Sequence, residues 1–408
     1  MRKISRSEEI LKKVLSGDIG LHEIEQYADA KQAIEIRQKA LEQTRKLKLE
    51  SIRQYTIDAE SASRHNIENM IGTVQVPLGI AGPLKIQGDH AKGDFYIPLA
   101  TTEAVLVASV NRGCSAIAAS GGAHAKIFLD SMTRAPVFKT ASISEAAKLV
   151  QWVQNKDNLE QMKSEASKST RYGELLHIDP YAVGRYVYLR MAYNTKDAMG
   201  MNMVTIASEL VARMIEKKTG AKLIALSGNM CADKKPSAIN LIQGRGKSVV
   251  AEAVIRKSIV EKALKTSPEA IVEVNQAKLL GSARAGSYGF NAHFANIIAA
   301  IFIATGQDAA QVVDGANGIT AAQLIENDDL HISVTIPSLE IGTVGGGTRV
   351  ETQKECLQIL GVQGSGSPPG ANARKFAEII ACAVLAGELS LLGAHASGHL
   401  AKAHKMKR

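Results

Sequence analysis

The sequence predicts an α/β (α+β) protein with a large helix-rich domain, an inserted ferredoxin-like βαββαβ domain and a small helical N-terminal domain. Two observations carry this prediction. Residues 136–227 hold segments typical of strand, helix, strand, strand, helix and strand, which is the ferredoxin-like order. On both sides of this unit, short strands alternate with longer apolar helices. We therefore expect three domains: 1–66, 67–135 together with 228–408, and the inserted 136–227.

The N-terminal domain is predicted from Ile and Leu at helical spacing among charged residues. Asp29 is an expected N-cap for a helix over 30–47, because its carboxylate can accept a hydrogen bond from the first turn. From residue 68 to 98 the pattern changes to strands broken by glycine and proline. The second domain is therefore expected to begin near Asn66.

The large domain is predicted to contain long, closely packed helices. The segment 101–120 is crowded with Ala, Ser and Gly, which let neighbouring backbones approach, and Glu103 is expected at its start. Further helices are predicted over 267–283, 291–306 and 371–404.

The inserted domain is predicted element by element. Strands are expected at 136–141, 170–178, 184–193 and 222–226, and helices at 144–154 and 197–218. The last strand reads as short and buried. The polar segment Lys156–Lys168 lacks strong periodicity, so a loop or an exposed helix end is expected there.

Composition narrows the class of protein. The 408 residues are 45% hydrophobic and 4% aromatic, and the net charge is +9. A positive charge suits nucleic acid, an anionic membrane or a phosphorylated small molecule. Few aromatics are available to stack on bases and no nucleic-acid-binding signature occurs, so nucleic acid is the weaker option.

Location is predicted from the cysteines and the apolar runs. Four widely separated cysteines form no CxxC pair, which fits a reducing cytosol. The N-terminus resembles neither a signal nor a transit peptide, and the apolar run Ile297–Ala304 is far shorter than the ~20 residues of a membrane-spanning helix. A soluble, cytoplasmic protein without a membrane anchor is expected.

The charged triplet Asp233, Lys234 and Lys235 marks a candidate site. Pro236 biases Lys235 away from helical geometry, so the triplet is expected on a loop that follows the strand 222–226. Loops on rigid elements position reactive side chains, although a surface turn is the alternative from these residues alone.

Three further segments resemble ligand-binding motifs but have structural alternatives. Gly246-Lys247-Ser248 resembles the end of a phosphate loop, but Leu241 stands where the first glycine is required. The glycines of GTVGGGT at 342–348 fit a strand-end turn, with backbone contact to a phosphate or nicotinamide left open. His395 and His399 have metal-chelating spacing but no third ligand, so a helix-surface pair is favoured and no metal is expected.

Several segments together resemble the 3-hydroxy-3-methylglutaryl-coenzyme A (HMG-CoA) reductase family, in its class I form. The resemblance covers roughly residue 50 onward. It rests on ENMIGTVQVPLGIAGPL (68–84), PLATTEAVLVASVNRGCSAI (98–117), DAMGMNMV (197–204), the charged loop, GQDAAQ (306–311), IGTVGGGT (341–348), and the C-terminal run from PGANARKF to GHLAKAHK.

The resemblance implies a two-step reduction of the HMG-CoA thioester to mevalonate and free coenzyme A with two NADPH. Lys234 would stabilise the oxyanion, and His404 would protonate the coenzyme A thiolate. Glu103 would donate a proton in the second step, with Asp308 coupled to it and to Lys234. Taken singly, Glu103, Asp308 and His404 would each read as structural residues.

The resemblance also implies binding residues. On the substrate side these are Glu68, Ser109, Asn111, Arg112, Arg134, Ser227, Asp233, Lys235, Lys278 and Asn296. On the NADPH side, in the inserted domain, they are Arg171, Tyr172, Asp197, Met199, Gly200, Met201 and Asn202.

The family builds its site between subunits, so a homodimer or a tetramer is implied. The basic C-terminus is expected to act as a flap over the substrate. The chain lacks the phosphorylatable serine of regulated members, so control by that switch is not expected. Two alternatives stay open on the residues alone. One is a coenzyme A-binding or acyl-sensing protein without redox activity, and the other is an enzyme of thioester hydrolysis or acyl transfer.

Overall fold

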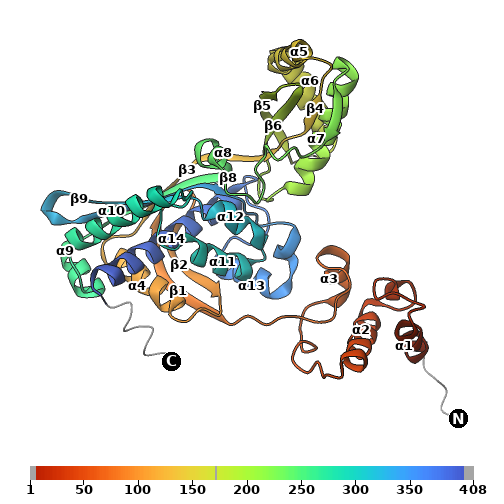
Figure 1. Ribbon diagram of the computed structural model, residues 1–408. Coiled ribbons are helices and arrows are strands. Elements are labelled where there is room, and N and C mark those ends of the chain that lie inside the picture. The colour runs from red at the N-terminus through yellow and green to blue at the C-terminus, as the bar shows by residue number, and fades with distance from the viewer. Residues whose placement is uncertain (1–5, 171, 399–408) are drawn as a thin grey trace.

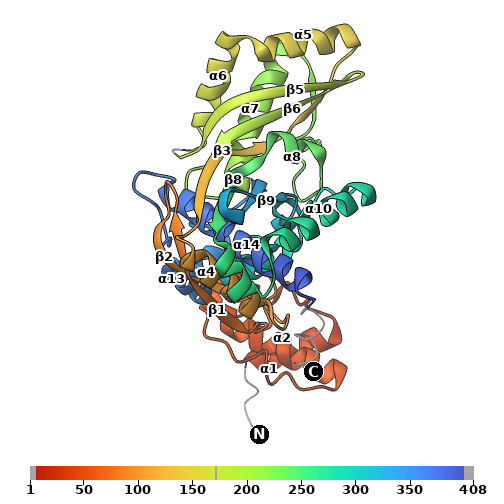
Figure 2. The same cartoon turned by 90° about the vertical axis from the view of Figure 1, so that its left-hand side faces the viewer.

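The computed structural model describes residues 6–170 and 172–398. Figure 1 shows three regions: red N-terminal helices, a large region around a blue helix, and a yellow-green domain projecting from it. In Figure 2 the N-terminal helices and the projecting domain extend from the large region in opposite directions. The mixed α/β class predicted from the sequence is confirmed.

The N-terminal region is helical. Its elements are α1 (Arg6–Ser16), the short η1 (Ile24–Gln26), α2 (Ala30–Arg45) and α3 (Ala59–His65). Asp29 caps α2 as expected, since its Oδ1 accepts a hydrogen bond from the Gln32 N–H at 2.8 Å. The buried side chains of this region form small clusters of their own, separate from the main core.

The large region is built around the C-terminal helix α14 (Ala371–Ala396). Among the described helices it alone is long and apolar enough to cross a bilayer, but 94% of its most apolar 18-residue window is buried inside the protein. It packs against α4, α11 and the strands β3, β8 and β10, whose side chains share its core. Its apolar composition is therefore explained by its place in the core.

The remaining elements of this region flank α14. Its strands are β1 (Leu78–Gln87), β2 (Lys92–Ala100), β3 (His124–Arg134), β8 (Arg245–Ile255), β9 (Ile319–Leu324) and β10 (Leu330–Leu339). Its α-helices are α4 (Leu106–Ala119), α8 (Ala238–Gln243), α9 (Lys257–Ile259), α10 (Pro268–Ala285), α11 (Phe294–Thr305), α12 (Val312–Gly315) and α13 (Glu351–Ile359). Short turns of other helix types are η2 (Val260–Leu264), η3 (Ala309–Gln311), η4 (Glu326–Asp328) and η5 (Gly346–Arg349).

The projecting domain has the ferredoxin-like arrangement. Its elements are β4 (Val137–Lys139), α5 (Ile143–Gln154), α6 (Lys156–Ser167), β5 (Glu174–Val183), β6 (Tyr186–Asn194), α7 (Met201–Thr219) and β7 (Lys222–Ala225). The strand order is β7-β4-β6-β5 and every pairing is antiparallel. The domain has its own hydrophobic core.

One sheet connects the two domains. Strand β6 pairs with β4 through Tyr186–Tyr188 and with the end of β3 through Met191–Tyr193. Strands β3, β8, β10 and β9 then continue the same eight-stranded sheet. The projecting domain is therefore fixed to the large region by backbone hydrogen bonds at the point where the chain leaves β6.

Three local expectations were wrong. The polar segment after residue 155 forms helix α6, because Asn155 caps it and Met162 and Ala166 are buried against the domain core. The strand β7 is an edge strand with mostly exposed residues, not a buried one. Helix α4 begins only at Leu106, so Glu103 lies in the turn before it.

Candidate active site

The loop 226–237, called here the Lys234 loop, runs from β7 to α8 with a strained backbone. Ala232 and Lys234 have left-handed φ angles of 52° and 58°. Each such residue costs about 1 to 2 kcal/mol relative to a right-handed one. Two side chains hold this shape: Asp314 Oδ2 accepts the Lys234 N–H at 3.0 Å, and Asn240 Nδ2 donates to the Ala232 carbonyl at 3.1 Å.

The Lys234 ammonium forms an ion pair with Asp308, 2.6 Å from Nζ to Oδ2. Asp308 also caps η3 through the Ala310 N–H, which fixes its carboxylate directly after α11. The two side chains remain 40% and 32% exposed, so they face open space and not the core. The coupling of Lys234 to Asp308 expected from the sequence is therefore present in the geometry.

A buried charged cluster lies beneath the Lys234 loop. The Arg245 guanidinium, fully buried at the start of β8, lies within 3.1 to 3.6 Å of carboxylates of Asp233, Asp314 and Glu340. Burial raises the pKa of Asp314, and burial raises the pKa of Glu340 to about 8, against the opposing effect of Arg245. Burial therefore favours the protonated form of Glu340 within this cluster, and Arg245 opposes it.

A cavity of about 860 Å³ joins Lys234 to the inserted domain. Lys234, Asp233, Asp308 and Arg134 line one part. Residues 198–203 and the glycine-rich 344–348 line another. The glycine-rich loop is held against residues 197–199 by the Thr343 N–H to the Asp197 carbonyl and by an Ala198–Val344 bridge. The cavity volume lies in the range of small-molecule sites.

Helix α7 points its N-terminus at this cavity. Gly200, at φ 91°, is the N-cap residue, and Met199, Gly200, Met201 and Asn202 all line the cavity. The unpaired N–H groups of a helix N-terminus favour anions such as phosphate. Four of the seven expected NADPH-side residues are thus brought together here.

Asp197 serves a different purpose from its neighbours. Its buried carboxylate accepts the N–H groups of Gly366, Gly370 and Ala373 at 2.6 to 3.0 Å, around the start of α14. Its side chain is therefore taken up in anchoring residues 198–203 to α14, and it does not line the cavity. Tyr172 is 68% exposed in the loop before β5, and Arg171 lies outside the described residues.

Glu103 lies apart from Lys234 within one chain. Its Oε2 accepts a hydrogen bond of 2.6 Å from Asn296 Nδ2, in the first turn of α11. From Asn296 to Thr305, α11 runs about 14 Å along its axis at 1.5 Å per residue, and Asp308 follows three residues after that opposite end. The geometry therefore forms two groups, Lys234 with Asp308 and Glu103 with Asn296, and does not bring Glu103 to Asp308.

The residues expected on the coenzyme A side hold α4 in place. Arg112 donates to Ser390 Oγ and to the Ser390 carbonyl on α14, and Ser109 Oγ lies 3.0 Å from Ser390 Oγ. Asn111 accepts the Gly82 N–H of β1. Glu68 is exposed between α3 and β1. Burial lowers the pKa of Arg112.

The other expected substrate-side residues are spread over three elements. Arg134, at the end of β3, donates to Thr205 on α7, and Lys235 donates to the Asp233 carbonyl. Ser227 Oγ lies 3.4 Å from Cys231 Sγ. Lys278 is half-buried on α10 and close enough to His395 to lower its pKa, after the larger effect of burial. His404 lies outside the described residues.

The chain is similar to known proteins over almost its whole length. Residues 33–408 match the family model described as hydroxymethylglutaryl-coenzyme A reductase. The chain is 58% identical to the 3-hydroxy-3-methylglutaryl-coenzyme A reductase of Pyrococcus abyssi, covering 98% of both chains. It is 46% identical to a reductase of this name from Oryza sativa subsp. indica, covering 98% of this chain and 74% of the rice protein.

The chain belongs to the HMG-CoA reductase family. Membership makes it an oxidoreductase. A solved structure of the class II 3-hydroxy-3-methylglutaryl-CoA reductase from Streptococcus pneumoniae, bound to NADPH, matches with a TM-score of 0.67 at 19% identity. It covers 94% of this chain and 98% of the other, and at this identity it supports the shared fold.

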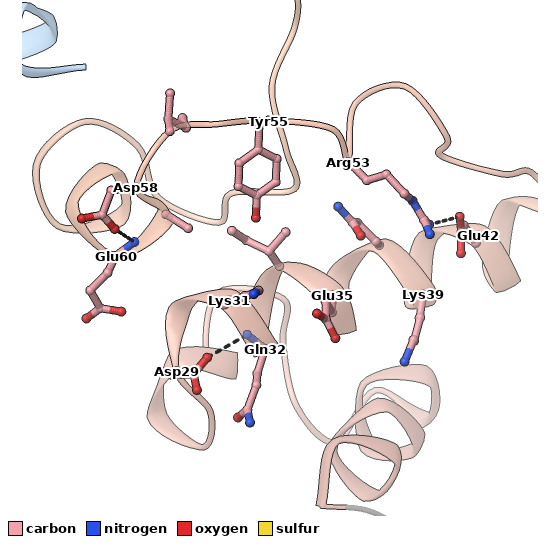
Figure 3. Close-up of a pocket in the computed structure, with 14 residues that line it drawn as sticks. Asp29, Lys31, Gln32, Glu35, Lys39, Glu42, Arg53, Tyr55, Asp58 and Glu60 are labelled. Carbon is pink, nitrogen blue, oxygen red and sulfur yellow. Dashed lines mark hydrogen bonds and ion pairs between the residues drawn. The ribbon is translucent and has the colours of Figure 1, made fainter. Parts of the chain in front are cut away.

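A second large cavity, of about 940 Å³, lies in the N-terminal region and away from these residues. Figure 3 shows Tyr55 pointing toward helix α2 and Arg53 paired with Glu42 on that helix, while Asp58 caps α3 through the Glu60 N–H. None of the residues expected to serve the reductase site lines it. The cavity beside Lys234 is therefore the candidate active site of this family member.

Sequence reasoning missed the buried cluster of Arg245, Asp314 and Glu340. Arg245 and Glu340 adjoin apolar strand segments, SVVAEAVI and SVTIPSL, and are fully buried. A charge next to a predicted buried strand signals a buried partner of opposite charge, since an isolated buried charge is costly. Among residues 6–170 and 172–398, no group of three or more His, Cys, Asp or Glu is arranged to hold a metal ion.

Proposed function

We propose that the chain reduces HMG-CoA to mevalonate and free coenzyme A in two steps, each using one NADPH. The observation that carries this proposal is the cavity that joins the Lys234–Asp308 pair to the N-terminus of α7. One end thus offers a fixed cation for a developing oxyanion, and the other offers backbone N–H groups for phosphate. Family membership supplies the reaction class.

The residue roles follow from the charge that each step develops. NADPH supplies a hydride to the thioester carbonyl carbon and later to the aldehyde carbon. Lys234 stabilises the negative oxygen that forms, and Asp308 holds its ammonium in place. When the carbon–sulfur bond breaks, the coenzyme A thiolate takes a proton, which we assign to His404. Glu103 donates the proton that the mevaldehyde oxygen needs in the second step.

We propose that two copies complete each site, in a homodimer or a tetramer. Within one chain Glu103 and Asn296 lie at one end of α11 and Lys234 and Asp308 at the other. A second copy related by two-fold symmetry can place its Glu103 near the first copy's Lys234, because such an interface repeats every contact.

The binding residues are proposed with the same division. Arg134, Ser227, Asp233, Lys235, Lys278 and Asn296 would serve the HMG portion, and Glu68, Ser109, Asn111 and Arg112 the coenzyme A portion. Met199, Gly200, Met201 and Asn202 would face NADPH, together with Arg171 and Tyr172. Asp197 would act by holding that segment on α14.

Class I form and a cytoplasmic location are also proposed. The class I form rests on the resemblance of the segments named in the sequence analysis. The solved structure described as class II is 19% identical to the chain, so it supports the shared fold alone. All four cysteines are free and buried, which suits a reducing compartment.

The test follows nicotinamide absorbance with purified protein. HMG-CoA should cause NADPH oxidation, two per mevalonate formed, and Lys234→Ala should lower the rate at least about 100-fold. Absence of HMG-CoA-dependent NADPH oxidation would favour the acyl-binding alternative. Release of coenzyme A without NADPH consumption would favour the hydrolase alternative, and either result would overturn the proposal.

A further inference from the structure

Arg245 contacts both halves of the candidate site. Its Nη2 lies 3.1 Å from Asp233 Oδ1 in the Lys234 loop and 2.8 Å from the sulfur of Met201 at the start of α7. Its Nη1 lies 3.1 Å from Glu340 Oε1 and 3.6 Å from Asp314 Oδ2. The side chain is fully buried, so it does not line the cavity itself.

Asp314 carries the influence of Arg245 to the reactive lysine. One carboxylate oxygen accepts the Lys234 N–H, and the other accepts Asn240 Nδ2, which in turn donates to the Ala232 carbonyl. Ala232 and Lys234, two of the three left-handed residues of the loop, are therefore tied to one buried carboxylate. That carboxylate depends on Arg245 for compensation of its charge, because a buried charge without a partner is strongly unfavourable.

A second link fixes Asp233, the neighbour of Lys234. Gln311 Nε2 donates to Asp233 Oδ1 at 2.9 Å, and Gln311 Oε1 accepts from Arg245 at 3.4 Å. Gln311 ends η3, the turn that Asp308 caps. Arg245 is thus connected to Lys234 through Asp314 and to the turn of Asp308 through Gln311, and neither Asp314 nor Gln311 lines the cavity.

We propose that Arg245 and Asp314 are positioning residues that hold Lys234 at a fixed place relative to the NADPH-facing start of α7. The inference rests on the proposed role of Lys234. The forked guanidinium suits this task, because its separate N–H groups contact Asp233, Glu340 and Met201 at once, which one ammonium cannot do. Loss of either residue should leave the cavity in place while displacing the lysine within it.

Two variants probe the two connections. Asp314→Asn keeps the size of the side chain but has one acceptor oxygen, so either the Lys234 N–H or Asn240 Nδ2 faces an amide donor. Arg245→Lys keeps the charge but not the fork. Arg37→Lys is the matched control, since Arg37 is, like Arg245, a fully buried arginine, and it pairs with Glu25 in the N-terminal region far from the site.

The experiment measures kcat, KM for each substrate, NADPH-binding stoichiometry and thermal unfolding for each variant. We expect Asp314→Asn to lower kcat per NADPH-binding site about 10- to 100-fold, because a displacement near 1 Å has an effect of this size, with KM for NADPH changed less than about threefold. Arg245→Lys should lower kcat similarly and also raise KM for NADPH, because Arg245, unlike Asp314, contacts Met201 at the start of α7. Arg37→Lys should alter only thermal unfolding.

The outcomes separate this inference from the proposed function. If Lys234→Ala is inactive while Asp314→Asn and Arg245→Lys keep wild-type kcat per binding site, the positioning role is wrong and the function stands. If the wild type shows no HMG-CoA-dependent oxidation of NADPH, the proposed function fails. If Lys234→Ala keeps wild-type turnover, the role assigned to Lys234 fails, and this inference fails with it while the function stands. If Arg245→Lys does not fold, Asp314→Asn decides alone. If Asp314 had only a structural role, the variant would change the NADPH-binding stoichiometry and the unfolding temperature but not kcat per binding site.

Discussion

Replacing Glu340 by glutamine should change how the stability of the protein depends on pH. Glu340 is fully buried, and burial raises its pKa from 4.5 to about 8. Between these two pH values the folded state keeps a proton that the unfolded state has lost. Stability therefore falls as pH rises across this window, because the folded state binds more protons than the unfolded one.

The magnitude follows from the two pKa values. Each pH unit inside the window removes about 1.4 kcal/mol, so the full window removes about 5 kcal/mol, and the loss is complete above pH 8. Glutamine is neutral throughout and keeps an oxygen for the contact that Arg245 Nη1 makes at 3.1 Å. The free energy of unfolding of the Glu340→Gln variant should therefore not show this loss with rising pH.

Urea unfolding followed by circular dichroism measures the effect. From pH 5.5 to 7.5, the free energy of unfolding of the wild type should fall by about 2.7 kcal/mol relative to that of Glu340→Gln. A second oxygen of Glu340 has no hydrogen-bond partner, so an amide there adds a cost that is constant with pH. Protein concentration and the m-value must stay constant across the series.

A parallel pair of curves would refute the reasoning. It would mean that Glu340 is ionised in the folded protein throughout this range, with Arg245 outweighing burial. The buried cluster would then hold three carboxylates against one guanidinium, and Glu340 would not be the source of the pH dependence.

Three further predictions concern other parts of the protein. Lys234→Ala and Glu103→Gln chains that are mixed unfolded and refolded together should regain about a quarter of wild-type activity. Half of the dimers are then mixed, and each mixed dimer has one intact site out of two. No recovery of activity would indicate that Lys234 and Glu103 of the same chain form the site. Asp197→Asn should lower the free energy of unfolding by about 2 to 4 kcal/mol, because an amide cannot accept all three N–H groups at the start of α14, and unchanged urea unfolding would contradict this. Gly306→Ala should lower it by at least about 2 kcal/mol, since φ is 67° and the added Cβ would lie 2.2 Å from the Gly347 carbonyl oxygen, whereas Gly281→Ala on α10, where a Cβ meets no neighbour, should not destabilise the protein.

The sequence predicted the elements whose signals are local. Asp29 caps α2 because its carboxylate needs only the next turn, and the long apolar pattern of α14 holds wherever the helix is packed. The ferredoxin-like order of the inserted domain was visible for the same reason. Lys156–Lys168 was misjudged because its polar sequence hides the two residues, Met162 and Ala166, that pack against the domain.

The candidate site could be predicted only as a set of residues and not as a geometry. Lys234 and Asp308 are 74 residues apart in the sequence, and Arg245 and Glu340 are 95 apart. Hydrophobic periodicity gives no information about contacts at such separations. Asp197 shows the consequence most clearly. The family resemblance implied an NADPH contact for its carboxylate, but that carboxylate is buried and accepts three backbone N–H groups around the start of α14.

The left-handed backbone at Lys234 is stabilised by buried side chains and cannot be relieved by replacing the residue with glycine. A glycine at position 234 would relieve the left-handed strain, but it would remove the ammonium that faces the cavity. The strain must therefore be offset by contacts that do not occupy the cavity, and Asp314 and Asn240 supply them from below the loop. Those contacts require a buried carboxylate, which in turn requires a buried cation. Arg245 meets that requirement and also contacts Met201 at the start of α7, so one buried residue links the support of the loop to the start of that helix.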